Sequence, residues 1–126
     1  MTAAAIPARQ LHCILADTAS GIPADTAAVE LLARHDHFLH LPEFRRLIAA
    51  GSAISSGEPA AVIRWRAAVH ALDRGQLPCS RTEAAVLRIA ASIGDDAISV
   101  RLRTLMGGLD HRNITLIAHA ITRANS

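Results

Sequence analysis

Apolar residues recur at intervals of three and four along most of the chain, which is the spacing of an amphipathic α-helix. The clearest segments lie near residues 8–17, 25–39, 59–74, 80–93 and 110–121. Breaks fall between them at Gly21, Pro42, Gly51, Gly75 and Gly94. The pattern therefore predicts an all-α fold, an irregular orthogonal bundle of about six or seven short helices.

The whole length, 1–126, is expected to form a single helical domain, with residues 1–7 disordered and residues 52–57 as a loop and hinge. A chain of this size can bury somewhat less than roughly 70% of its unfolded surface, which is enough for a core without cross-links. A third helix is expected to begin at Pro42 and to end at Gly51, burying Phe44, Leu47 and Ile48.

Two of the predicted helices have especially regular apolar faces. Between residues 59 and 74 the face consists of Val62, Trp65, Val69 and Leu72. In the last helix, from Asp110, the residues expected to be buried are Ile114, Ile117, Ala118 and Ile121. Apolar and polar residues alternate over 98–103, as they would in a strand. No second strand is evident for this segment to pair with, so a helix is predicted there also.

The basic residues are all arginine, and they are unevenly distributed. Residues 1–63 carry four arginines against six acids, whereas residues 64–126 carry nine against five. The total of +2 is no nucleic-acid signature, but the C-terminal half is the better surface for an anionic partner. Absence of lysine beside abundant alanine is typical of a high-GC coding bias, which weakens any interpretation of single arginines.

Cellular setting is inferred from what the sequence lacks. Cys13 and Cys79 have no zinc-site or redox-motif spacing and are expected to be reduced, buried thiols. The N-terminal residues form no signal-peptide core, and no apolar run approaches the ~20 residues needed to cross a bilayer. We therefore expect a cytoplasmic protein with no membrane contact, and no nucleotide or other cofactor motif is found.

Residues 35–40 hold the densest cluster of metal-ligand types. On a continuous helix His37 and His40 share a face, as do Asp36 and His40, and Glu43 could add an oxygen from the next turn. His35, however, falls on the apolar face, and no second cluster completes four ligands. The pattern favours a buried His35 with exposed His37 and His40 over a metal site.

Cys79 precedes Ser80 and Glu83, which have the spacing of a helix-capping box. A thiol at the positive end of a helix can become a nucleophile. Cysteine phosphatases also need an arginine six positions later, where this chain has Ala85. With no base or oxyanion donor to assign, the pattern favours Cys79 as an apolar residue packed before the helix, and no catalytic residue is predicted.

Residues 82–106 have spacings that resemble a helix-turn-helix, with Ala90 at the crossing, Gly94 in the turn and Val100 as an apolar anchor. The side chains that would reach DNA are those of Arg81, Arg88, Arg101, Arg103 and Arg112. Asp95 and Asp96 stand at the start of the second helix, where they would repel phosphates. An ordinary helical corner accounts for the same spacing.

The segments LPCSRTEAAVLRIAASI and LMGGLDHRNITLIAHAI, within residues 76–122, resemble the C-terminal half of small helical proteins of actinomycetes. The resemblance rests on general patterning and carries no activity. It implies a bacterial, helical and cytoplasmic protein.

With no catalytic set, the leading hypothesis is a non-enzymatic helical module that binds a protein partner or itself. Ile63, Leu87 and Leu116 lie off the main apolar faces of their helices and are expected to supply spare apolar surface. The alternative is a DNA-binding regulator that uses residues 82–106. A metal- or cysteine-dependent enzyme is the third hypothesis.

Overall fold

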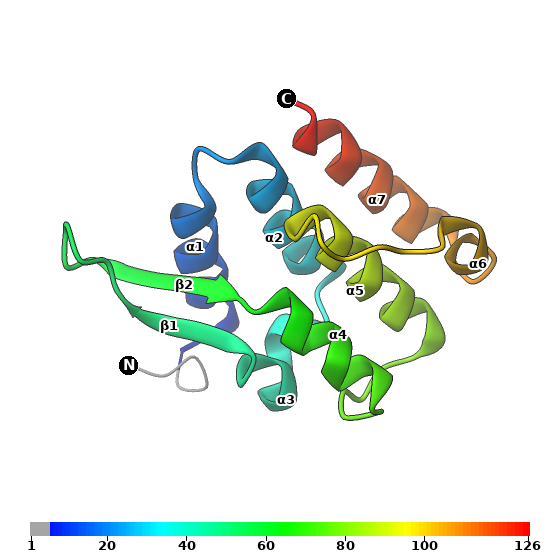
Figure 1. Ribbon diagram of the computed structural model, residues 1–126, viewed down its shortest axis with the longest axis horizontal. Helices are drawn as coiled ribbons and strands as arrows, with labels where there is room; N and C mark the ends of the chain where they lie inside the picture. Colours follow the sequence, from blue (N-terminus) through cyan, green and yellow to red (C-terminus); the bar gives the residue numbers. More distant parts are fainter. Residues whose placement is uncertain (1–5) are drawn as a thin grey trace.

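The computed structural model describes residues 6–126 and is mainly helical, with a small antiparallel sheet (Figure 1). The N-terminal elements are α1 (Ala8–Ala19), α2 (Pro23–His35), the 3₁₀-helix η2 (Phe38–His40) and α3 (Pro42–Arg45). A hairpin follows, made of β1 (Ile48–Ser52) and β2 (Pro59–Ile63). The C-terminal elements are α4 (Trp65–Asp73), α5 (Arg81–Gly94), α6 (Leu102–Met106) and α7 (His111–Ala124).

The prediction of a purely helical fold is wrong over residues 48–63. The third helix ends at Arg45, the fourth begins only at Trp65, and the segments between them pair in register from Ile48↔Ile63 to Ser52↔Pro59. In β1 only Ile48 is buried, whereas in β2 burial alternates, with Ala61 and Ile63 facing the core and Val62 facing outward. Tertiary packing therefore decided the conformation of a segment whose alanines have little strand preference of their own.

β2 packs against α1, and a threonine hydroxyl joins the two elements. The Thr18 hydroxyl donates a hydrogen bond to the Ile14 carbonyl (2.8 Å) and accepts one from the Ala61 amide (3.1 Å). The tip of the hairpin turns through Gly57, whose φ of +72° favours glycine. The loop expected over residues 52–57 lies at the tip of the hairpin, where it joins two strands instead of two helices, and Ser52 itself ends β1.

Helix ends are set by local signals that the sequence contains. Pro23 occupies the first turn of α2, where a missing amide costs nothing. The same helix ends at His35, because Asp36 adopts a left-handed conformation with φ of +65°. Ser80 and Glu83 form the predicted capping box at the start of α5, with reciprocal hydrogen bonds of 3.1 and 2.7 Å.

The core lies around α2, which packs against α1, α5 and α7 (Figure 1). Its largest fully buried side chains are Phe38, Phe44, Leu11, Leu15, Leu31, Leu32, Leu87 and Val86. The rings of Phe38 and Phe44 lie 5.5 Å apart and join η2 to α3. Residues 1–5 of the expected disordered segment 1–7 lie outside the described part of the chain, whereas Ile6 is buried in the core.

Residues 95–101 connect α5 to α6 without regular structure, so the helix expected over 98–103 begins only at Leu102. The face of α7 also differs from the prediction. Asn113, Ile117 and Ala120 are buried, whereas Ile114 and Ile121 are about half exposed. Ile117 belongs both to the face that was expected to be buried and to the face that is buried. Packing against α2 buries the side of α7 that carries Asn113 and Ala120, and it leaves Ile114 and Ile121 on the outside.

Candidate functional site

The predicted metal ligands do not converge. His40 Nε2 lies 2.6 Å from the Asp36 carboxylate on the surface, and this hydrogen bond lowers the pKa of Asp36. His37 instead lies against α5, with Nδ1 3.1 Å from Glu83 and Nε2 3.0 Å from the Pro78 carbonyl. Among residues 6–126 no group of three or more candidate ligands could hold a metal ion.

His35 is buried, as its position on the apolar face predicts, and stacks against Phe38 with ring centroids 6.1 Å apart. Its Nδ1 atom is buried without a hydrogen-bond partner in the described part of the chain. Burial lowers the pKa of His35 more than the nearby Glu83 carboxylate raises it. This histidine therefore belongs to the core, where its neutral form is favoured.

Cys79 is half-buried beside the capping box and forms no disulfide. Cys13 is also a free thiol, but it is exposed, so the expectation that it is buried is wrong. Burial raises the pKa of the Cys79 thiol, and the Glu83 carboxylate raises it further. A catalytic thiol needs the opposite shift, because the thiolate is the nucleophile. The surroundings of Cys79 therefore agree with a packing role before α5.

The arginines of the helix-turn-helix hypothesis fall into two groups. Arg88 is bound to Asp73 at 2.6 Å, and Arg112 donates to the Arg34 carbonyl at 3.0 Å. Arg101 and Arg103 are exposed beside α6, a helix of one turn that is separated from α5 by residues 95–101. The compact turn and long second helix of the DNA-binding motif are therefore not what these residues form.

An apolar surface extends over the C-terminal helices. We call it the α6–α7 face and define it by Leu102, Met106, Ile114, Ala118 and Ile121. The exposed fractions of its large side chains are 47%, 51%, 48% and 53% respectively, with Ala118 also exposed. Ile114, Ala118 and Ile121 recur at helical spacing, so they lie along one side of α7. Of the residues expected to supply spare surface, Ile63 and Leu87 are buried instead, and Leu116 is partly buried against the core.

The surroundings of this face are positively charged. Neither α6 nor α7 contains an acidic residue. On the neighbouring α2, the Glu30 carboxylate is shared by Arg34 (3.7 Å), His119 (3.4 Å) and Arg123 (3.4 Å). One carboxylate cannot balance two arginines, so the ridge where α2 meets α7 keeps a positive excess.

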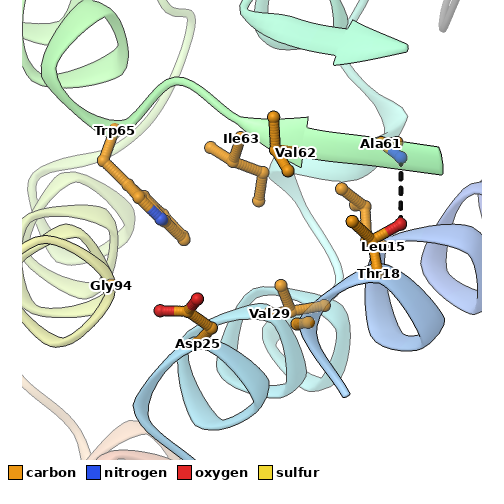
Figure 2. A pocket seen from close by; sticks show the side chains of 10 residues that line it. Leu15, Thr18, Asp25, Val29, Ala61, Val62, Ile63, Trp65 and Gly94 are labelled. Carbon is orange, nitrogen blue, oxygen red and sulfur yellow. Dashed lines mark hydrogen bonds between the residues drawn. The ribbon is translucent and has the colours of Figure 1, made fainter. Parts of the chain in front are cut away.

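A separate cavity of about 180 Å³ lies between α1, α2, β2 and α4 (Figure 2). Its lining residues are Leu15, Thr18, Ala19, Asp25, Val29, Ala61, Val62, Ile63, Trp65 and Gly94. Figure 2 shows the Asp25 carboxylate directed toward the indole of Trp65, across from the aliphatic side chains. Sequence spacing could not reveal this cavity, because its walls come from five elements distant along the chain.

No family model matches the chain, and comparisons with curated proteins and with solved structures found no similar protein. Within residues 6–126, no helix combines the length and apolar character needed to cross a membrane. Function must therefore be argued from the α6–α7 face, its charges and the cavity.

Proposed function

We propose that the chain is a non-enzymatic binding module that docks an acidic, amphipathic protein segment on its α6–α7 face. The observation that carries the proposal is the row of half-exposed apolar side chains along α7, with those of α6 before it. Exposed apolar side chains on consecutive helices, with basic residues around them, are typical of a protein interaction site. A cytoplasmic setting agrees with the two free thiols.

Apolar contact would supply the affinity. Covering the exposed half of Ile114 or Ile121 would contribute about 1 kcal/mol each, because complete burial of such a side chain contributes about 1.5–3 kcal/mol. Ala118 lies between them and has almost no side chain, so a partner helix could approach α7 closely at this point. The spacing suits an amphipathic helix laid along α7.

Charge favours an acidic partner over a second copy of the chain. A two-fold contact between α7 helices would bring together two helices that contain no acidic residue between His111 and Ala124, and both would carry Arg112 and Arg123. Like charges at an interface oppose association, whereas glutamates or aspartates on a partner would pair with them. Duplex DNA would match the charge but would leave Ile114 and Ile121 against phosphates.

The proposal is tested with a short fluorescein-labelled amphipathic helix of leucine and glutamate, titrated with the protein and followed by fluorescence anisotropy. We expect saturable binding, which the matched leucine–lysine peptide lacks. Replacing Ile114 and Ile121 by serine should weaken binding about tenfold or more, since each loses about 1 kcal/mol of contact. Ile54→Ser is the matched control, because Ile54 is fully exposed at the hairpin tip.

Three results would overturn the proposal. Equal binding of the glutamate and lysine peptides would show that the basic residues around the face do not select an acidic partner. Sedimentation of the unmodified protein as a dimer that Ile114→Ser dissociates would indicate a second copy as the occupant. Salt-dependent binding of duplex DNA that is lost on replacing Arg101 and Arg103 by alanine, yet kept by the serine variants, would favour the DNA-binding alternative.

A further inference from the structure

We propose that the cavity between α1, α2, β2 and α4 binds a small organic amine, with the Asp25 carboxylate as counter-ion and a compact hydrocarbon group against the aliphatic wall. This site is distinct from the α6–α7 face, and the ligand is of a different chemical class. The inference rests on the shape of the cavity, its lining and the absence of a partner for Asp25 within the described residues.

Aliphatic side chains form one part of the cavity wall, and polar atoms form about half of its accessible lining. Leu15, Val29 and Ile63 are buried, and they supply aliphatic side chains from α1, α2 and β2. Val62 is half exposed and forms part of the rim. An engineered apolar cavity of about 150 Å³ accepts benzene. The present cavity, at about 180 Å³, therefore has room for one small ring or a short branched chain.

Asp25 supplies the only ionisable group in the lining. The carboxylates that form ion pairs within residues 6–126 are those of Glu30, Asp36, Asp73, Glu83 and Asp95. Asp25 is not among them. Arg66, which follows Trp65 in α4, is held by Asp95 at 3.0 Å. A half-buried carboxylate beside an apolar wall thus remains available to a cation that enters from solution.

The other polar groups of the cavity limit which kinds of ligand it can bind. The Thr18 hydroxyl already uses its proton on Ile14 and accepts from the Ala61 amide. No second carboxylate lines the cavity, so a bare Mg²⁺ or Ca²⁺ ion would lack the several oxygen ligands it needs. An ammonium group needs fewer partners, so the single carboxylate suits an organic cation better than a bare metal ion. The indole of Trp65 lines the site beside this carboxylate.

The position of Trp65 depends on the close approach of α5. A Cβ atom on Gly94 would lie 2.3 Å from Nε1 of the indole, so only glycine permits this packing. The indole is thereby held between α5 and the cavity, with the Asp25 carboxylate directed toward it (Figure 2). The aromatic edge and the carboxylate are brought together from α4 and α2, two elements that are distant in the sequence.

The chain itself provides the reporter for the test. Trp65 is the only tryptophan and there is no tyrosine, so intrinsic fluorescence comes from the lining of the cavity. We expect benzylamine to change the emission of Trp65 in a saturable manner at neutral pH. Benzyl alcohol has nearly the same shape without the charge, and it should bind about tenfold or more weakly, because a charge-assisted contact is lost.

Asp25→Asn should weaken benzylamine binding to the level of benzyl alcohol and leave the alcohol unaffected. Glu58→Gln is the matched control, since it removes a carboxylate from the exposed hairpin. If Asp25→Asn does not fold, the affinities of benzylamine and benzyl alcohol for the unmodified protein still test whether the positive charge of the ligand contributes to binding. Linear, unsaturated quenching, equal binding of amine and alcohol, or full binding by a folded Asp25→Asn variant would each overturn the proposal.

Discussion

A Cβ atom placed on Gly94 would come within 2.3 Å of the indole Nε1 of Trp65 and 2.5 Å of its Cε2. The glycine ends α5, and the tryptophan begins α4, so this one contact sets how closely the two helices approach. The nearby Arg66–Asp95 ion pair joins the same two helix ends at 3.0 Å. A large ring on α4 is thus accommodated by the smallest residue on α5.

Gly94→Ala should destabilise the protein. Overpacking costs about 1–3 kcal/mol, whereas the gain in helix propensity from alanine is at most about 1 kcal/mol. We therefore expect a net loss of roughly 1–2 kcal/mol in urea unfolding, with a shift in Trp65 emission in the folded state. Gly51→Ala is the control, because nothing lies within 4 Å of its added Cβ. Unchanged emission and stability in Gly94→Ala would contradict the contact.

His35 should make folding sensitive to mild acid. Burial lowers the pKa of this histidine below its usual 6.5, so the unfolded chain binds the proton more readily than the folded one. The contribution of His35 to the free energy of unfolding is fully present above about pH 6.5. It is lost as the pH falls from there toward the pKa of His35 in the folded protein. The slope cannot exceed about 1.4 kcal/mol per pH unit for one proton. Glu83 and Asp36, whose pKa values are lowered, lose their contributions only below about pH 4.5.

The measurement is urea unfolding at several pH values between 7.5 and 5, on the unmodified protein and on His35→Leu. Leucine removes the titrating ring together with its unpaired Nδ1, so the stability of the variant should depend less on pH in this range. His70→Gln, at an exposed position on α4, should leave the profile as it is. Parallel profiles for His35→Leu and the unmodified protein would show that the acid sensitivity arises elsewhere.

The sequence predicts the elements that have local signals. Ser80 and Glu83 fix the start of α5, and Pro23 and Gly94 lie at the beginning of α2 and the end of α5. Gly94 ends its helix as expected, but the need for glycine comes from Trp65, which no pattern within α5 could indicate. Local chemistry thus predicts where helices begin and end better than what they contact.

The hairpin and the exposed face depend on contacts between distant segments. Ala49, Ala50, Ala60 and Ala61 suit a helix as well as a strand, and only their pairing and packing on α1 selects the strand. On α7 the choice between two apolar faces is made by α2. The cavity has no periodic signal at all, since Asp25 and Trp65 approach each other only in the folded chain.

Thr18 should contribute to the attachment of the hairpin. Its hydroxyl accepts a hydrogen bond from the amide of Ala61, a buried residue of β2. Thr18→Val keeps the shape but leaves that amide unpaired, and a buried unpaired donor costs about 1–3 kcal/mol. Thr115→Val is the matched control, because that hydroxyl makes only the bond to the His111 carbonyl within its own helix. Equal unfolding free energies for the two variants would contradict a special role of Thr18.

Two consecutive arginines at the end of α3 should differ sharply. Arg45 donates from Nε to the Leu39 carbonyl at 2.7 Å and from Nη1 to the carbonyl of Ile6, so it joins α3 to η2 and to the segment before α1. Arg46 is exposed beside it. Arg45→Met should lower the free energy of unfolding by about 2 kcal/mol, because two charge-assisted hydrogen bonds are lost while the methionine side chain keeps the packing of the arginine methylene groups. Arg46→Met should change stability by less than about 0.5 kcal/mol.

For a chain of this length, the Arg45→Met loss corresponds to a Tm lower by roughly 6–10 °C, which thermal unfolding followed by circular dichroism resolves. A local readout separates this effect from general loosening. Arg9 follows Ile6 and is exposed at the start of α1, so release of the Ile6 carbonyl should speed cleavage by trypsin after Arg9. If cleavage there is equally slow in the Arg45→Met and Arg46→Met variants, the bond to Ile6 does not hold this segment, and the buried Ile6 side chain alone must do so.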